Sequence, residues 1–360
     1  MSPTPLPTAC AETVLEAAAA VAAEDEDRAG VAMFLTLRPQ PGPTATPAVQ
    51  ADSSEADTSA ADPPAVDFSD LAARLARVWE VLADADPDVT VQDALAVLAD
   101  LELRPTPAPA PAVRPDRLAA WRPAGWTVPP RAERDAEAAE VRDALAGGRL
   151  LRVVNYHDTP VSRRAEFRGE LQWYAERFDP VTAADVLEFQ VSGRWRSERP
   201  GILPAFYDGF ASAVRVVEPL LAETGLVGWF YPPTAFLDVP AEQQRTFATA
   251  HHYGVLEHPE GRLAMTWDDL ARLAETHEVC GHTATHAASR EVRDAGDVET
   301  QVLRPIARLS EVCGRPPAAW AWLGGTPFDP LAPGDQAVRA CGVPLFTSNA
   351  SMQGLGSAPW

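Results

Sequence analysis

The sequence contains no lysine, so all 30 of its basic residues are arginines. Schiff-base chemistry and a Walker-type phosphate loop both need a lysine amine, and both are therefore excluded. Basic residues are also scarce as a class, because 51 acidic residues leave a formal net charge of −21. An acidic surface repels phosphate backbones and anionic lipid, so we expect neither nucleic acid nor a membrane as a partner.

Cysteines and long apolar runs are few as well. The four cysteines form no CxxC pair and have no regular spacing, which indicates reduced thiols rather than a disulfide framework. No stretch approaches the ~18–20 apolar residues of a membrane span. The first 20 residues lack the basic and strongly apolar regions of a signal peptide. These features predict a cytoplasmic protein.

Changes in composition divide the chain into four parts. We predict a helical N-terminal segment over residues 1–37, because residues 11–35 are rich in alanine. Residues 38–66 consist mainly of Pro, Ala, Ser and Asp and are predicted to be a disordered linker. Residues 67–147 are predicted to be a helical region with a proline-rich spacer at 104–115, and residues 148–360 the main domain.

Apolar residues at helical spacing predict two short helices within residues 67–147. One apolar stripe comprises Leu71, Leu75, Val78 and Leu82, and a second comprises Val91, Leu95, Leu98 and Leu101. Thr90 and Asp93 have the spacing of a helix-capping pair at the start of the second helix. Such a helical hairpin is either a docking element for a protein partner or a cap that packs on the main domain.

From Leu150 onward, short apolar runs alternate with helical patterns of about three turns. This alternation is the signal of a βα-repeat fold, an α/β architecture with a parallel sheet. In such folds the ligand site lies at the carboxyl ends of the strands. The polar residues that directly follow each predicted strand are therefore the candidates for function.

Three strand ends carry such residues. One ends in Tyr207-Asp208, another in His282 with His286 four residues later, and the first in His157-Asp158. Histidines at i and i+4 face the same way on a helical turn and can bind one metal ion. A carboxylate from another strand end would complete a two-His, one-carboxylate site. By itself the HxxxH spacing is weak, since such pairs are more often surface or core residues.

The order of these pieces resembles the polysaccharide deacetylase family, also called the NodB-homology family or carbohydrate esterase family four. The family's Tyr-His strand is matched by VVNYH, its TFDDG strand by AFYDG at Ala205–Gly209, and its metal-binding HxxxH motif by HTATH. A WDDL segment at 267–270 precedes the histidines, as in the family. The resemblance spans roughly residues 150–350 and implies a distorted (β/α) barrel.

The resemblance also implies a chemistry. The metal ligands would be Asp208, His282 and His286, and the metal a divalent ion, with zinc first and cobalt, nickel or iron as alternatives. The reaction would be hydrolysis of an amide bond in an intracellular N-acyl small molecule or sugar derivative. Tyr207 stands where the family has its catalytic base, an aspartate.

The altered base leaves alternatives open. Tyr207 itself, His157 or Asp158 could serve as the acid or base, and the last two could instead only support the ligands or cap a loop. The protein could also be a catalytically inactive, deacetylase-like binding protein. A facial two-His, one-carboxylate set suits iron and oxygen chemistry as well.

Overall fold

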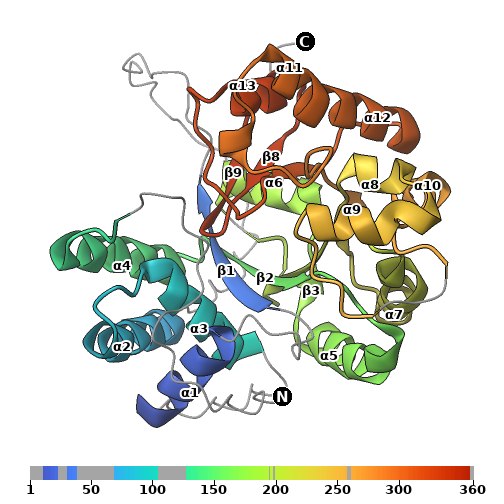
Figure 1. The fold of residues 1–360 in the computed structure, drawn as a ribbon. Coiled ribbons are helices and arrows are strands. Elements are labelled where there is room, and N and C mark those ends of the chain that lie inside the picture. Colours follow the sequence, from blue (N-terminus) through green and yellow to red (C-terminus); the bar gives the residue numbers. More distant parts are fainter. Residues whose placement is uncertain are drawn as a thin grey trace, which may run out of the picture.

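The computed structural model describes residues 11–22, 31–38, 69–103, 127–193, 195–197, 199–257 and 261–356 (Figure 1). Its strands are β1 Val31–Arg38, β2 Leu150–Tyr156, β3 Asp179–Pro180, β4 Gly201–Tyr207, β5 Trp229–Tyr231, β6 Glu278–Val279, β7 Ala319–Ala321, β8 Leu345–Thr347 and β9 Ser351–Gly354.

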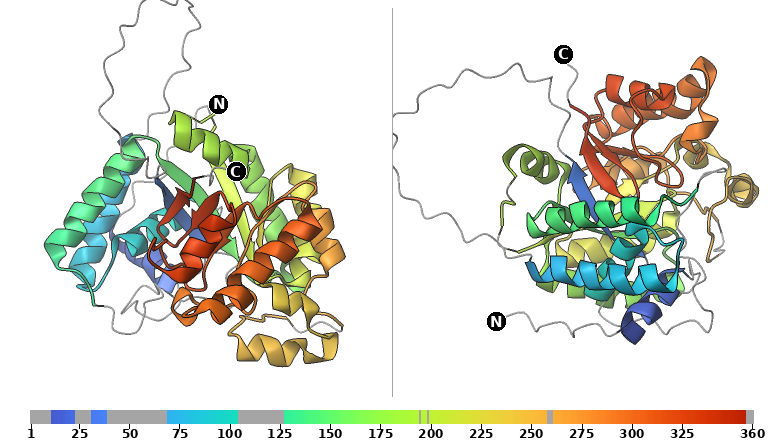
Figure 2. Two further views of the ribbon diagram at one scale, coloured as in Figure 1. Left: turned by 90° about the horizontal axis from the view of Figure 1, so that it is seen from above. Right: turned by 90° about the vertical axis from the view of Figure 1, so that its left-hand side faces the viewer.

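The helices surround this sheet on several sides (Figures 1 and 2). They are α1 Ala11–Ala22, α2 Ser69–Ala85, α3 Val91–Leu103, α4 Arg131–Ala146, α5 Arg164–Arg177, α6 Ala183–Ser192, α7 Glu218–Thr224, α8 Thr234–Asp238, α9 Gln244–Ala250, α10 Trp267–Leu273, α11 Ala295–Val298, α12 Arg304–Cys313 and α13 Pro333–Ala340. Shorter 3₁₀ or π turns cover 161–163, 213–217, 241–243, 289–291 and 299–303.

Eight strands form a nearly closed ring in the order β6-β5-β4-β2-β1-β9-β8-β7, with β3 beside β4. Beyond the end of β6, Gly281 N donates to Ala319 O at 2.8 Å, and Ala321 N donates to Gly281 O at 3.1 Å. These bonds join the two edges of the sheet. The predicted α/β fold with a distorted barrel is confirmed.

Glycine is required where the ring closes. A Cβ atom at Gly281 would lie 2.4 Å from a ring carbon of Trp320, so any other residue would have to displace this buried indole ring. Gly281 directly precedes His282, and the close approach therefore also fixes where the first candidate metal-binding histidine leaves its strand.

Strand β1 corrects the prediction for the N-terminal part of the chain. Residues 11–22 are helical as expected, but Val31–Arg38 is a strand. It pairs antiparallel with β2 and parallel with β9, so this part of the predicted 1–37 segment belongs to the barrel. The remaining linker residues 39–66 and the spacer at 104–115 lie outside the described residues.

Side chains of the strands alternate between two cores. Residues of β1, β2, β4, β5, β7, β8 and β9 fill the barrel interior, among them Leu35, Leu151, Leu203 and Trp229. The opposite faces of β2, β4 and β5 pack against the surrounding helices through residues such as Val154, Phe206 and Phe230. Since both faces are buried, these strands contain nearly continuous apolar residues.

The N-terminal helices pack on the barrel, and α3 contacts β1 directly. The predicted capping pair is confirmed: Thr90 N donates to Asp93 Oδ2 at 2.7 Å, and Asp93 N donates to Thr90 Oγ1 at 3.3 Å. The predicted apolar stripes of α2 and α3 lie in the core that these helices share with β2 and β4. This packing fits a helical cap, while a protein partner for these helices stays a prediction. No helix of the described ranges is long and apolar enough to cross a membrane.

Candidate metal centre

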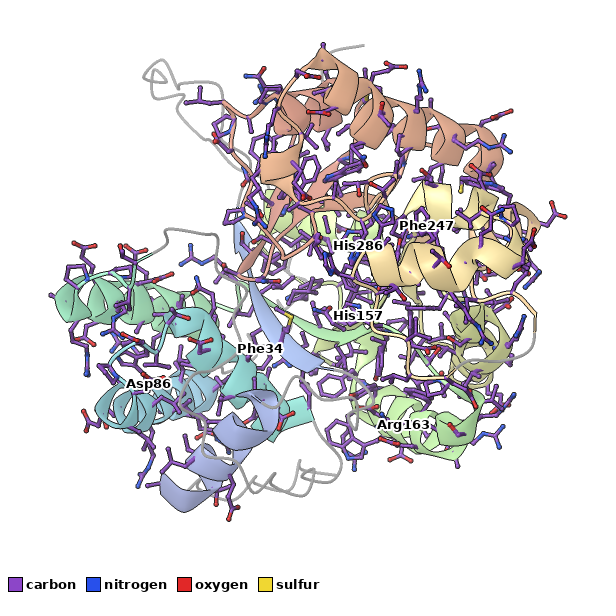
Figure 3. The ribbon with its side chains drawn as sticks, in the orientation of Figure 1. Phe34, Asp86, His157, Arg163, Phe247 and His286 are labelled. Carbon is purple, nitrogen blue, oxygen red and sulfur yellow. The ribbon has the colours of Figure 1, made fainter. Side chains whose placement is uncertain are left out.

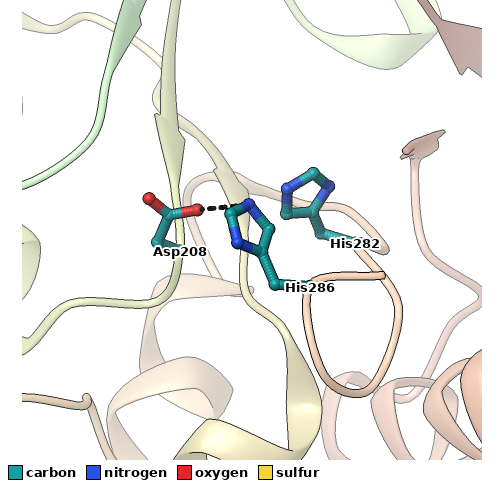
Figure 4. Close-up of side chains that lie close together, drawn as sticks. All are labelled: Asp208, His282 and His286. Atoms are coloured by element: carbon teal, nitrogen blue, oxygen red, sulfur yellow. Dashed lines mark ion pairs between the residues drawn. The ribbon is translucent and has the colours of Figure 1, made fainter. Parts of the chain in front are cut away.

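Asp208, His282 and His286 come together at the carboxyl ends of β4 and β6 (Figure 4). Each offers one ligand atom, these atoms all lie within 4.8 Å of one another, and all three residues are buried. The resemblance of the sequence motifs implied this trio. The two strand ends are about 75 residues apart, and parallel strands bring their carboxyl ends to one side of a sheet. The three residues could hold one metal ion.

Backbone carbonyls orient both imidazoles. His282 Nδ1 lies 2.8 Å from Ala321 O, and His286 Nδ1 lies 2.9 Å from His251 O. A carbonyl oxygen only accepts, so each Nδ1 carries the proton and each Nε2 keeps its lone pair for a ligand. This is the arrangement in which metal-binding histidines are commonly fixed.

The carboxylate of Asp208 fits the same purpose. Its Oδ1 is buried and lies 3.3 Å from His286 Nε2, yet it accepts no hydrogen bond among the described residues. Buried carboxylate oxygens are rarely left without a partner, so this atom fits a cation. The donor set, with two imidazole nitrogens and one carboxylate oxygen, suits zinc and related divalent ions.

The backbone at the site is held in unusual conformations. Asp208, Thr283 and His286 have φ angles of 68°, 62° and 62°, in the left-handed region that non-glycine residues seldom adopt. Such residues cluster at functional sites, where the surrounding structure holds them in place. Here Gln301 Oε1 accepts from the N–H groups of Ala284 and Thr285 at 3.2 and 3.1 Å, and so fixes the loop between the two histidines.

The charges at the site also fit a metal ligand set. Burial raises the pKa of Asp208, but His157, His286 and His282 lower it by more, to about 2. Burial, and next the neighbouring His286, lower the pKa of His282 to about 3. Near neutral pH the site therefore offers an anionic carboxylate and a neutral His282 imidazole, the forms that bind cations.

His157 lies beside this trio. Its Nδ1 is 2.8 Å from Asp208 Oδ2, and its side chain is 56% exposed. Figure 3 labels His157 and His286 in the middle of the molecule. The carboxylate of Asp208 is thus shared, with Oδ2 facing His157 and Oδ1 facing His286. The structure brings His157 to the site that the sequence predicted.

Tyr207 is held by aromatic packing rather than by polar contacts. Its ring stacks on Tyr231 at 4.6 Å and on His157 at 5.6 Å, and it makes an edge-to-face contact with His282 at 5.3 Å, all measured between ring centroids. Burial raises the pKa of the Tyr207 phenol above its usual range. Tyr207 therefore lines a cavity beside the trio. Because its phenol stays protonated near neutral pH, it is a poor base.

Asp158 has a different environment. Its Oδ1 accepts from Ser212 Oγ at 2.7 Å, and its Oδ2 accepts from the N–H groups of Leu256 and Glu257 at 2.9 and 3.1 Å. The carboxylate is buried and fully engaged in holding this loop. These contacts fit the loop-capping role that the sequence left open for Asp158.

A cavity of about 330 Å³ opens beside the trio. His157, Tyr207, His282 and His286 line it on one side, and the loops after β7 and β8 line it with Trp322 to Gly325 and Thr347 to Asn349. A third side, which the sequence did not predict, is made by Val21 of α1, Met33 and Leu35 of β1, and Gln92, Asp93 and Ala96 of α3. Correct assignment of β1 as a strand would have placed Met33 and Leu35 on its inward face.

The cavity wall at Trp322 rests on a buried carboxyl group. Trp322 Nε1 donates to Asp335 Oδ1 at 2.6 Å, and Asp329 N donates to Asp335 Oδ2 at 2.7 Å. Burial raises the pKa of Asp335 to about 6. The folded protein therefore keeps this proton at pH values where the unfolded chain has released it.

This linkage predicts how the free energy of unfolding depends on pH. The stability associated with protonated Asp335 should be lost as pH rises from about 4 to about 6, by roughly 3 kcal/mol in total. Denaturant unfolding of wild type and Asp335→Asn at several pH values measures it. We expect the stability of wild type relative to the variant to fall across this range, and parallel curves would contradict the assignment.

No protein-family model and no curated protein matches the sequence. Solved structures do match. IcaB from Ammonifex degensii is 19% identical, with a TM-score of 0.40 over 54% of this chain and 81% of the other. The deacetylase PplD of Streptococcus pyogenes, solved in complex with acetate, is 13% identical, with a TM-score of 0.41 over 52% and 79%. A de-N-acetylase from Aggregatibacter actinomycetemcomitans is 14% identical, with a TM-score of 0.40 over 54% and 86%. Two of these proteins are deacetylases by name.

Proposed function

We propose that the protein is a deacetylase-like, metal-dependent hydrolase of amide bonds that acts on a small N-acyl compound or sugar derivative. The observation that carries the proposal is the buried trio of Asp208, His282 and His286, whose ligand atoms converge beside a cavity and next to His157. The order of the sequence motifs, which resembles that of polysaccharide deacetylases, supports the same reaction.

The ligands would be Asp208 Oδ1 and the Nε2 atoms of His282 and His286, because their other polar atoms already have partners. Three protein ligands leave positions open for water and substrate, as in catalytic zinc sites. A bound divalent ion supplies Lewis-acid activation of an amide carbonyl and of a water molecule. We propose zinc first, with cobalt, nickel or iron as alternatives.

His157 is the residue that we propose as the proton carrier in place of the family's aspartate. Its Nδ1–H donates to Asp208 Oδ2, and its half-exposed ring lines the cavity, where Nε2 is the nitrogen that can exchange a proton with substrate. An imidazole held in this way can accept a proton from the attacking water and pass it to the departing amine. Tyr207 would serve as the stacked support for the His157 ring.

Replacement of His157 by glutamine tests this role. We expect hydrolysis of an N-acyl substrate to fall about 10²-fold, the lower end of what general acid–base catalysis contributes, with bound metal unchanged. The matched variant is Tyr207→Phe, which keeps the stacked ring and should retain activity within a few-fold. Steady-state kinetics and metal analysis of both proteins give the answer. Full activity in His157→Gln, or its loss in Tyr207→Phe, would contradict the assignment.

The donor set supports one other function. A facial set of two histidines and one carboxylate is also the ligand set of non-haem iron oxygenases. Metal analysis of protein purified without added metal separates the two functions. Bound iron together with substrate-dependent oxygen consumption would replace the hydrolase proposal, whereas zinc without oxygen consumption would support it.

A further inference from the structure

The side of the cavity furthest in sequence from the metal trio is mostly apolar. Its two polar residues, Gln92 and Asp93, have their polar groups bonded to Glu137 and Thr90. Met33 and Leu35 belong to β1, Ala96 to α3 and Val21 to α1, and all four line the same cavity as His157 and the two candidate metal-binding histidines. Leu35 is 1% exposed and packs in the barrel interior, with Met33 packed against the same core. We call these four residues the N-terminal wall.

The polar side chain of Asn155 also lines the cavity. Asn155 lies on β2 two residues before His157, so both side chains face the barrel interior. Asn155 Nδ2 is 2.7 Å from Met33 Sδ, and its Oδ1 is buried with no hydrogen-bond partner among the described residues. A thioether is only a weak acceptor, so the carboxamide lacks a strong partner whichever way it is turned.

These features fit one kind of ligand. A cavity of about 330 Å³ lies at the small end of the range for small-molecule sites. One side carries His157, Asn155 and the two candidate metal-binding histidines, and the N-terminal wall adds an apolar surface on another side. A compound with a hydrogen-bonding amide group and an apolar chain beyond it would match both ends.

We propose that the N-terminal wall receives the acyl chain of the substrate and selects its length, and that Asn155 binds the substrate amide N–H. This inference rests on the proposed function and names its substrate class: small N-acyl compounds whose acyl chain is longer than acetyl. Residues 31–38 and 91–103, which lie outside the region of motif resemblance, then determine specificity. Asn155 is a positioning residue for the substrate and not a catalytic residue.

The wall can be tested with a series of N-acyl-4-nitroanilides from acetyl to octanoyl. We expect wild type to prefer a chain longer than acetyl. Ala96→Leu fills the wall and should lower kcat/KM for hexanoyl and octanoyl substrates about tenfold or more, with the acetyl substrate within threefold. Met33→Ala enlarges the cavity and should move the preference toward longer chains. Leu331→Ala, at a position 82% exposed, is the control and should change neither.

A second readout does not depend on turnover. Titration calorimetry measures the affinity for acetate, butyrate, hexanoate and octanoate, the acids that such substrates would release. We expect affinity to rise with chain length in wild type, and Ala96→Leu should weaken octanoate binding about tenfold.

The role of Asn155 is tested by steady-state kinetics. For Asn155→Ala we expect KM to rise about tenfold at nearly constant kcat and unchanged metal content. An unchanged KM would overturn the role of Asn155.

The two proposals fail in different ways. Hydrolysis with an unaltered chain-length preference in both Ala96→Leu and Met33→Ala would overturn the wall and leave the hydrolase intact. Chain-length-dependent acid binding that Ala96→Leu weakens, without hydrolysis of any substrate, would leave the wall and overturn the hydrolase. Absence of both hydrolysis and acid binding would overturn both.

Discussion

Replacing Asp208 by asparagine is expected to abolish stoichiometric metal binding and to lower hydrolysis of an N-acyl substrate about 10⁴-fold or more. The loss exceeds that of His157→Gln because it removes the Lewis acid and also replaces the anionic acceptor that orients His157 by a neutral amide. Asparagine is the suitable replacement, since it tolerates the left-handed φ of 68° at this position and keeps the shape of the side chain. Its neutral amide, however, is a poor ligand for a divalent ion.

Elemental analysis after dialysis and a kinetic assay on the same samples measure the effect of Asp208→Asn. Asp268→Asn, on the exposed side of α10, is the matched control and should keep both metal and activity. Retention of one equivalent of metal in Asp208→Asn would contradict the ligand assignment. Loss of the metal with full activity would instead contradict a metal-dependent reaction.

Replacing Leu35 by aspartate should produce the largest loss of stability. Leu35 is 1% exposed inside the barrel, and its backbone pairs with Leu151 of β2. Aspartate there would place an unpaired carboxylate out of contact with water. Such a buried charge lowers the free energy of unfolding by about 4 kcal/mol or more. That loss corresponds to a fall in Tm of roughly 10 °C or more.

Thermal unfolding followed by circular dichroism is the measurement for Leu35→Asp. Leu331→Asp is the matched control, because Leu331 is 82% exposed and the same substitution there should leave Tm nearly unchanged. Equal Tm values for the two variants would show that Leu35 is not inside the barrel, and would also remove the N-terminal wall.

Local chemistry made much of the fold predictable. The Thr90–Asp93 cap, the helices that follow it and the strand-end positions of Asp208 and His282 depend on residues close in sequence, and the structure confirms them. Strand β1 could not be predicted from neighbouring residues in this way. Its outward Phe34 and inward Leu35 are both buried, so the segment lacks the alternation that distinguishes a strand from a helix.

The candidate site was predictable to a similar degree. Neighbouring residues of an extended chain point to opposite sides, so only one of His157 and Asp158 could face the metal ligands. The sequence could not decide which, because the choice depends on contacts with Asp208 and with the loop at Leu256, about 50 and 100 residues away. The placement of Tyr207 and of the N-terminal wall also depends on contacts between residues that are distant in the sequence.

The position of β1 between β2 and β9 has a consequence for the order of events at the ribosome. Thr36 bonds to Ala350, a residue 314 positions later, so the ring cannot close until nearly all of the described chain has been synthesised. At common translation rates that interval is roughly 15–60 s. Strand β2 can cover one edge of β1 earlier, but the edge that pairs with β9 lacks its partner for the whole interval and must stay away from other strands. Barrel closure is therefore a late step, and the nascent protein is the form in which the chain is most exposed to aggregation and to chaperones.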